Sequence, residues 1–407
     1  MRVLNVSAAS EFSGAGIAAL LTHNALIKSG IESRLLYIKS NNASETNGIK
    51  QYENSLYKTI IRKVVTFLDN LTLYFYPDRN KELFSISILG INHVNNPDFI
   101  WADIIHLHWV NHGFISIPEI TKWQKPVVWT LRDMWPITGG CHYSYNCFNY
   151  ISGCGSCDHL KSSFKYDISY YLNKRKKHYL STKRIKWVAI SSWLAKVALE
   201  SEILRNAEID IIYSGIDSEK FNLISKVEAR EMLNLPYDCT ILLIGATNIK
   251  DKYKGYEYIL ELVNQLNGNI VVVSFGNGIL DKKLIKHRVI EFGFVSDNQF
   301  LNLLYNSADL FLAPSISEAF GKTFAEAQCS GLPVLCFNNT GPMDIVEHKV
   351  TGYLADYLSK DDLLYGYNFL INSELDRSYI SNRAKSLFDI DVIIDNYIKL
   401  YYSILYE

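Results

Sequence analysis

The chain has 407 residues, of which 48% are hydrophobic and 20% charged, a composition typical of a folded soluble protein. Its 41 Lys and Arg residues nearly balance 42 Asp and Glu residues, so the formal net charge is −1. The balance excludes a global positive field that would attract nucleic acid, and the length favours two or three domains.

The opening residues read as a buried strand rather than a signal peptide. No apolar run approaches the ~18 residues that a membrane-spanning helix needs. We therefore expect a cytoplasmic protein, with contact at the inner face of the cell membrane left open. In that setting the seven Cys residues argue against a disulfide framework.

Apolar strand-like runs alternate with helical stretches along the whole chain, which predicts an α/β fold with parallel sheets covered by helices. The strands expected in the first half are Arg2–Ser7, Ser33–Ile38, Ile104–His108, Val127–Thr130 and Trp187–Ser191. Those expected in the second half are Thr240–Ala246, Asn269–Ser274, Val289–Phe292, Leu310–Pro314 and Pro333–Phe337.

Two sets of strands predict two doubly wound, Rossmann-like domains. A short apolar run with turn residues, from Asp210 to Phe221, marks the boundary. The predicted domains are residues 1–210 and residues 211–388. Residues 389–407 are predicted to form a helix that packs on the first domain.

The most informative stretch contains Glu318 and Glu326, separated by seven residues. It follows a predicted strand, and a helix should begin near Gly321–Thr323. Ligands of open parallel sheets bind at the carboxyl ends of strands, and backbone N–H groups at a helix start favour a phosphate. The alternative interpretation is that both Glu residues are ordinary surface carboxylates of a helix.

The pattern Glu-x7-Glu, followed by the run from Cys329 to Val334, resembles the signature of retaining glycosyltransferases of family 4. The resemblance implies a GT-B fold with two facing doubly wound domains, in which residues 1–210 bind the acceptor and residues 211–388 bind the nucleotide sugar. It also implies a C-terminal helix that returns to the first domain. It places Glu318 against the donor sugar or its phosphate and Glu326 on the ribose. Phe320, Gly321, Lys322 and Thr323 would complete this part of the donor site.

A second patch follows the strand that ends at Gly245. The family usually has Gly-Arg and then Lys-Gly, with both cations on the donor diphosphate. Lys254 matches that Lys, whereas Ala246 stands at the Arg position, so Lys250 or Lys252 would supply the missing charge. A solvated Lys-rich loop is the alternative. Phe294 lies in the segment that the family places beside the nucleobase.

In the first half, Gly14 and Gly16 follow a strand and precede a helix expected from Ile17. Such a loop lets the backbone approach a ligand closely, although an ordinary tight turn has the same composition. The resemblance implies that this loop lies near the donor phosphates and the acceptor.

Two further strands end in polar residues. His108 ends one of them, and Arg132 and Asp133 follow the other. The stretch from Arg132 through His142 resembles a subgroup of the family that is associated with colanic-acid and related surface polysaccharides. That subgroup usually has His where this chain has Arg132. A guanidinium cannot act as a base, but it can grip a phosphate or a carboxylate, with Asp133 orienting its neighbours. For His108 and His142, sugar contacts and purely structural roles stay open.

Cys141, Cys147, Cys154 and Cys157 follow in a loop rich in Tyr, Asn, Ser and Gly. Four thiolates could hold a structural Zn²⁺ and so fix such a loop. Four reduced thiols are the equal alternative, and a disulfide ranks below both.

Two segments suit an anionic membrane or a lipid-diphosphate acceptor. The first is the basic, Tyr-rich run Lys161–Lys186, and the second is Ser55–Tyr76, which has a broad apolar face. The alternative is that both are solvated helices covering the sheet.

These observations together predict a retaining glycosyltransferase that moves a sugar from a nucleotide-diphosphate donor to a glycan or lipid-linked acceptor in surface polysaccharide biosynthesis. No catalytic metal or other cofactor is expected. Two alternatives stay open: a GT-B epimerase of sugar nucleotides and a catalytically silent subunit that binds a nucleotide sugar.

Overall fold

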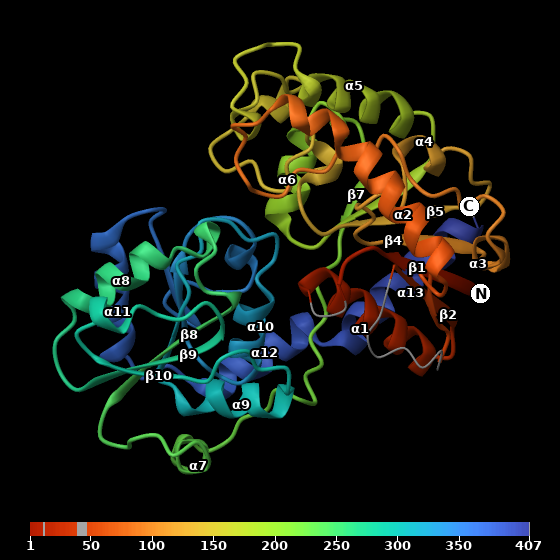
Figure 1. Ribbon diagram of the computed structural model, residues 1–407. Coiled ribbons are helices and arrows are strands. Elements are labelled where there is room, and N and C mark those ends of the chain that lie inside the picture. Colours follow the sequence, from red (N-terminus) through yellow and green to blue (C-terminus); the bar gives the residue numbers. More distant parts are fainter. Residues whose placement is uncertain (11–12, 39–46, 407) are drawn as a thin grey trace. The chain divides into compact units, whose positions relative to one another are not determined.

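The computed structural model describes residues 1–10, 13–38 and 47–406. The chain divides into two compact units (Figure 1). The first unit consists of Met1–Ile212 and Ile394–Glu407, and the second of Tyr213–Ile393. None of the helices in the described ranges is long and apolar enough to cross a membrane.

The first unit is built on a sheet whose strands all pair in parallel, in the order β3-β2-β1-β4-β5-β6-β7. Its strands are β1 (Arg2–Ser7), β2 (Glu32–Tyr37), β3 (Ile49–Gln51), β4 (Ile104–Leu107), β5 (Val127–Leu131), β6 (Ile185–Ala189) and β7 (Ile209–Ile211). Every residue of β4 and β5 is buried. Their nearly continuous apolar sequences fit strands that are covered on both faces.

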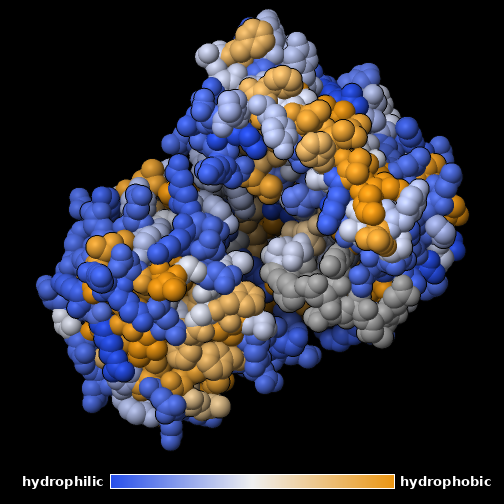
Figure 2. All heavy atoms as spheres, viewed as in Figure 1, coloured by the Kyte–Doolittle hydropathy of each residue, from blue (hydrophilic) through white to orange (hydrophobic). Residues whose placement is uncertain are grey.

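Helices and short 3₁₀ turns cover this sheet. They are α1 (Gly14–Lys28), α2 (Leu56–Asp69), η1 (Asn70–Phe75), α3 (Pro97–Trp101), α4 (Ile117–Ile120), η2 (Trp135–Ile137), η3 (Asn149–Ile151), η4 (Asp158–Leu160), α5 (Ile168–Leu180) and α6 (Ser192–Glu200). Helix α2 differs from the others, because apolar residues gather on its outer surface (Figure 2).

The second unit repeats the design, with parallel strands in the order β10-β9-β8-β11-β12-β13. Its strands are β8 (Thr240–Asn248), β9 (Ile270–Asn277), β10 (Arg288–Glu291), β11 (Leu310–Leu312), β12 (Val334–Phe337) and β13 (Gly352–Ala355). Its helices and 3₁₀ turns are α7 (Lys226–Met232), η5 (Lys252–Lys254), α8 (Tyr256–Gln265), η6 (Lys282–Leu284), α9 (Asn298–Ser307), α10 (Lys322–Cys329), η7 (Gly341–Asp344), α11 (Lys360–Ile371) and α12 (Arg377–Phe388).

Each sheet reverses its winding direction once. In the first unit the chain runs outward from β1 to β2 and β3, and on the other side from β4 to β7, so the reversal lies between β1 and β4. In the second unit it lies between β8 and β11. Loops leave the sheet in opposite directions at such a switch point, and the crevice between them is where open α/β sheets bind ligands.

Helix α13 (Ile390–Tyr406) follows the second unit in sequence, yet its residues from Ile394 onward belong to the first. The Tyr401 hydroxyl is hydrogen-bonded to His106 Nδ1 at 2.7 Å, and the hydroxyls of Tyr397 and Thr130 are hydrogen-bonded to each other at 2.9 Å. The helix is therefore anchored to β4 and β5 through buried hydrogen bonds.

The predicted α/β class with two doubly wound, Rossmann-like units is confirmed, but several boundaries differ. The strand expected at Trp187–Ser191 is Ile185–Ala189, because the Ser191 hydroxyl instead accepts from Leu194 N–H and starts α6. The helix expected from Ile17 begins at Gly14, since Ser13 caps it. Strands β3, β7 and β13 were not predicted; each has only three or four residues.

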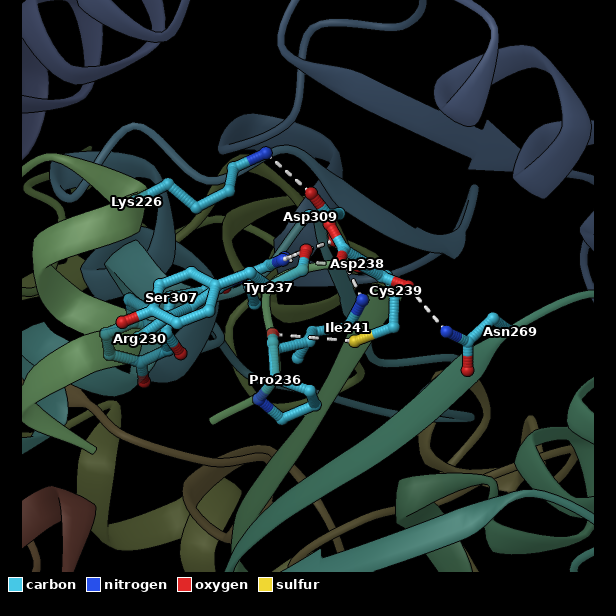
Figure 3. Close-up of polar contacts among 12 residues, drawn as sticks. Lys226, Arg230, Pro236, Tyr237, Asp238, Cys239, Ile241, Asn269, Ser307 and Asp309 are labelled. Atoms are coloured by element: carbon cyan, nitrogen blue, oxygen red, sulfur yellow. Dashed lines mark hydrogen bonds and ion pairs between the residues drawn. The ribbon is translucent and has the colours of Figure 1, made fainter. Parts of the chain in front are cut away.

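A network around Asp309 joins α7 to the second sheet (Figure 3). The Asp309 carboxylate accepts from Arg230 Nη2 and from Ile241 N–H, both at 2.7 Å, and contacts Lys226 Nζ at 2.5 Å. Arg230 also donates to the carbonyl oxygens of Ser307 and Tyr237. The Arg230 side chain is only 5% exposed, so its charge depends on these acceptors.

We expect Asp309→Ala to destabilise the second unit by about 3–5 kcal/mol, because it leaves the buried guanidinium of Arg230 without its carboxylate. Lys226→Ala is the control, because it removes the other ion pair of Asp309. The Lys226 side chain is 40% exposed, so its loss should cost at most about 1 kcal/mol. Calorimetry measures the loss, and tryptophan fluorescence follows the first unit separately, since all seven Trp residues lie in that unit. Equal losses in both variants would contradict this account.

Candidate active site

The switch point of the second sheet brings together Lys254 and Glu318, two residues predicted for the sugar-donor site. Lys254 follows β8, and Glu318 lies in the loop after β11. Lys254 Nζ contacts Glu318 Oε1 at 2.5 Å, and the Ser315 hydroxyl donates to the same oxygen at 3.2 Å. With side chains 17% and 10% exposed, the pair concentrates opposite charges at the edge where ligands of this fold class bind.

Glu326 lies inside α10, and each of its carboxylate oxygens has one partner within the protein. Its Oε2 accepts from the Tyr305 hydroxyl at 3.1 Å, and its Oε1 forms an ion pair with Lys322, one turn earlier on the same helix. Burial, followed by the charge of Glu326, raises the pKa of Tyr305 well above its ordinary value, so Tyr305 remains a hydrogen-bond donor. A carboxylate has about four acceptor positions, so Glu326 can still accept from a ligand.

Glycines let the loops at this switch point approach one another. Gly255 has a φ of 71°, and a Cβ there would lie 1.9 Å from the Pro314 carbonyl oxygen. A Cβ on Gly245 would lie 2.0 Å from the Phe275 ring. Both positions need glycine for packing within the protein, a requirement separate from ligand binding.

The helices that start here have bare N-termini. Gly255 precedes α8 and Gly321 precedes α10, both glycines adopt the left-handed conformation, and neither end has a side-chain cap. By contrast, side chains cap α9, α11 and α12 of the same unit. The uncapped N–H groups at the switch point are suited to an anion.

The other residues predicted for the donor site are more scattered. Lys250 and Phe294 are exposed on the loops after β8 and β10, and Thr323 lies in the first turn of α10. Phe320 is buried between Tyr213 and Phe388, with ring centroids at 6.1 and 5.5 Å, so its side chain is part of the core. Gly14 and Gly16 start α1 in the first unit, beside the switch point of the other sheet.

In the first unit, Asp133 and His142 form a buried hydrogen-bonded chain. Asp133 Oδ2 lies 2.7 Å from His142 Nδ1 and accepts from Trp109 Nε1 at 2.9 Å, while Oδ1 accepts from Trp135 N–H at 2.9 Å. Burial alone would raise the pKa of Asp133, but the charge of His142 and these hydrogen bonds outweigh it and lower the pKa below its ordinary value. The carboxylate is therefore held in its ionised form.

The hydrogen-bonded row of Asp133 and His142 continues to Ser85, a residue that the sequence analysis did not single out. Ser85 Oγ lies 2.9 Å from His142 Nε2, so Ser85, His142 and Asp133 are linked in a row. Both ring nitrogens of His142 are occupied, and a sugar hydroxyl would have to replace Ser85 to reach it. Ser85 lies in a loop, 57 residues from His142, and carries no local motif that could have identified it.

Arg132 and His108 form a second buried network. Arg132 Nη2 lies 3.0 Å from His108 Nδ1, and His108 Nε2 lies 3.1 Å from Asn5 Oδ1. Burial lowers the pKa of His108 well below its ordinary value, which keeps the ring neutral; Nδ1 then accepts from Arg132 and Nε2–H donates to Asn5. The structure thus gives His108 and Arg132 internal partners, and their roles toward a ligand stay predictions.

Several cations of the basic run Lys161–Lys186 have partners within the protein, and one of them is buried. Lys176 is buried, donates to the carbonyl oxygens of Trp135 at 2.5 Å and Thr138 at 3.0 Å, and lies 3.8 Å from the Trp135 ring centroid. Burial lowers its pKa to about 7. Lys174 and Lys177 both pair with Glu202. The interpretation of this run as a surface for membrane or lipid diphosphate is wrong for Lys176, which holds the loop that follows β5.

The four Cys residues of the predicted zinc site all line one small cavity. Burial raises the pKa of the Cys154 thiol to about 12, and Gly139 N–H donates to its sulfur at 3.1 Å. Nowhere in residues 1–10, 13–38 and 47–406 do three or more His, Cys, Asp or Glu side chains form a group that could hold a metal ion. Zinc binding therefore stays a prediction, which the metal content of the purified protein would test.

Residues 241–387, most of the second unit, match the family of glycosyl transferases group 1. The match includes Lys254, Glu318 and Glu326, the residues that meet at or near the switch point of the second sheet.

Similar proteins extend the likeness beyond this domain. An uncharacterized glycosyltransferase of Methanocaldococcus jannaschii is 28% identical over 44% of this chain and 48% of its own length. The Escherichia coli protein WcaC, named for a glycosyl transferase role in colanic acid biosynthesis, is 20% identical over 85% of each chain. The crystal structure of Anabaena HepE in complex with UDP-glucose superposes with a TM-score of 0.66, at 15% identity, over 99% of this chain and 100% of HepE. The chain thus has the GT-B fold that the sequence predicted.

We expect Asp133→Asn to lower the unfolding free energy of the first unit by about 1–3 kcal/mol at neutral pH, since an amide has a single acceptor oxygen and cannot serve both Trp135 N–H at one position and Trp109 and His142 at the other. The folded pKa of Asp133 is lowered, so its stabilisation is fully present above the unfolded pKa of about 4 and is lost as the pH falls through the folded value. The difference from wild type should therefore shrink on acidification. Tryptophan fluorescence during denaturation measures it, with exposed Asp78→Asn as the control. A difference that does not depend on pH would contradict the role of the Asp133 charge.

Proposed function

We propose that the chain is a retaining, metal-independent glycosyltransferase. It would move a hexose from a nucleotide-diphosphate sugar to a glycan or lipid-linked acceptor in surface polysaccharide biosynthesis. The group 1 domain supports the transfer of a sugar, and the role for which WcaC is named supports the pathway class. The observation that carries the proposal is the pairing of Lys254 with Glu318 beside two uncapped helix starts.

This arrangement supplies what a leaving diphosphate needs. Lys254 and the N–H groups at the starts of α8 and α10 are positive groups fixed at one sheet edge. Without a ligand, Glu318 neutralises Lys254 at 2.5 Å. On donor binding the diphosphate would take over Lys254, which stabilises negative charge as the anomeric C–O bond breaks. Metal independence is proposed because these groups provide the positive charge.

The release of Lys254 would leave Glu318 free to face the sugar. Its backbone is fixed on both sides, since Glu318 N–H donates to the Thr340 hydroxyl at 3.1 Å and Gly341 N–H donates to the Glu318 carbonyl oxygen at 2.9 Å. A carboxylate held in this way can accept sugar hydroxyls or stabilise positive charge at the anomeric carbon. Retention follows the resemblance to family 4, and no enzymic nucleophile is assigned.

Glu326 is proposed to bind the ribose of the donor. Tyr305 holds one carboxylate oxygen, while Lys322 covers the other and is 24% exposed. A ribose diol could replace Lys322 without disturbing Tyr305, because Lys322 reaches Glu326 through a flexible chain. UDP-glucose, the ligand of the HepE structure, is the first nucleotide sugar to test.

Glu326→Ala should weaken the binding of the matching nucleoside diphosphate roughly 10- to 100-fold, the range expected when a charged hydrogen-bond acceptor is lost. Titration calorimetry with UDP, GDP, ADP and their sugar conjugates measures this. Glu374→Ala, which removes an exposed carboxylate of the same unit, is the control and should bind as wild type. Unchanged affinity in Glu326→Ala would remove the ribose assignment, and tight binding of a nucleotide sugar without turnover would favour a silent subunit.

Glu318→Gln should lower kcat roughly 100-fold or more while donor affinity changes little, because its charge matters most in the transition state. Sugar release or transfer from the donor identified above gives kcat, and calorimetry gives affinity. An equal loss in kcat and in affinity would show that Glu318 only binds the donor. Donor turnover that needs no acceptor would instead point to an epimerase.

A further inference from the structure

Helix α2 is attached to the first unit by its polar side. Arg62, Thr66 and Asp69 follow one another at intervals of four and three residues and so lie on one side of the helix. Arg62 Nη1 and the Thr66 hydroxyl both donate to the His112 carbonyl oxygen, at 3.3 and 2.8 Å. Arg62 also forms an ion pair with Glu53. These contacts bind the helix to the protein through hydrogen bonds and charge.

The end of the helix is fixed in the same way. The buried carboxylate of Asp69 accepts from the backbone N–H groups of Ser87, Ile88 and Leu89 at 2.7 to 2.8 Å. Gly113 lets the helix approach closely, since a Cβ there would lie 3.1 Å from Thr66 Cα. The contacts of Arg62, Thr66 and Asp69 therefore make the inner side of α2 the side that attaches it to the first unit.

The opposite side of α2 is apolar and faces outward. It continues into η1 and comprises Leu56, Ile60, Val64, Phe67, Leu71 and Phe75, here named the α2 apolar face. These side chains are 46% to 82% exposed, and Figure 2 shows them as part of a continuous hydrophobic patch. A helix of a water-soluble domain normally turns this side inward, so an exposed patch of this kind marks a contact surface.

The charges beside the α2 apolar face are positive. Before Asp69, the charged residues of α2 are Lys58, Arg62 and Lys63, of which Arg62 is paired with Glu53 on the attached side. Lys63 is exposed at the border of the face. Exposed Tyr57 and Tyr74 flank it, and aromatic rings with a polar tip are favoured at the boundary between lipid and water. Such a combination of apolar, aromatic and cationic groups matches the acyl-chain, boundary and headgroup layers of an anionic bilayer.

We propose that the α2 apolar face docks the protein onto an anionic phospholipid bilayer. The helix would lie in the plane of the interface, its apolar side among the acyl chains and Lys63 among the lipid phosphates. With 14 residues α2 is too short to span the membrane. The docking is independent of the transferase activity, so each can fail without the other.

A cavity of about 380 Å³ lies at the end of α2, and Asp69, His112 and Gly113 of the attached side belong to its lining. Its lining includes Leu73 and Tyr74 from η1, and Arg79 and Lys81 from the segment that follows. The acidic residues of the lining have other partners, because Asp69 binds backbone N–H groups and Glu82 contacts His159. The cavity therefore offers cations next to the apolar face, as a phosphate headgroup requires.

The test is co-sedimentation of the full chain with vesicles of phosphatidylcholine alone or mixed with phosphatidylglycerol, without any nucleotide. Wild type should bind the mixed vesicles, and the double variant Val64→Glu with Phe67→Glu should bind at least about tenfold more weakly. The control is Val227→Glu with Met232→Glu on α7, where the side chains are 62% and 59% exposed, and it should bind as wild type. Lys63→Glu should weaken binding to the anionic vesicles only.

Three results would overturn the proposal. Wild type could fail to bind the vesicles, or the α2 and α7 variants could lose binding equally. Alternatively, sedimentation velocity could show a dimer that the α2 variant dissociates, which would assign the face to a second copy of the chain. Tryptophan fluorescence checks that the α2 variant is folded. If it is not, Phe67→Trp with brominated lipids replaces it, and absence of lipid quenching at the new Trp would equally overturn the proposal.

Discussion

The rest of the structure depends on one constraint, the burial of both faces of two parallel sheets. A strand covered on both faces has no room for a charge along its length, so polar side chains gather where strands end. The winding of each sheet reverses at one place, and the loops diverge there. Lys254 and Glu318 meet at one such place, and His108 lies at the end of β4 beside the other. The position of the proposed chemistry thus follows from how the chain fills its cores.

The carboxylates of the candidate site already have partners. Glu318 is held by Lys254 and Ser315, Glu326 by Lys322 and Tyr305, and Asp133 by His142 and two N–H donors. A ligand at Glu318 or Glu326 would therefore exchange one partner for another. This exchange keeps buried charge compensated at each step, and it makes the flexible Lys side chains the groups that move. Asp133 has no such mobile partner, which fits a supporting role.

The sequence predicted the layered fold because hydrophobic runs and glycine turns are local signals. It also placed Lys254, Glu318 and Glu326, since their motif is short and lies next to strand ends. It could not identify Ser85 or Tyr305, because each reaches its partner from a distant segment and has no motif of its own. It placed Lys176 in a solvated basic run, since charge alone does not reveal that Trp135 covers one of the nine cationic residues of this run. The apolar face of α2 was visible in sequence, but only the contacts of Arg62, Thr66 and Asp69 show which side is attached.

Helix α13 has a consequence for how the chain is made. Its Tyr397 and Tyr401 complete hydrogen bonds to Thr130 and His106 in the interior of the first unit. A chain leaves the ribosome N-terminus first, so residues 1–212 are outside the ribosome before the second unit has been synthesised. During that interval β4 and β5 lack their covering helix, and their polar side chains face water. The unit that is translated first is thus the one that finishes folding last.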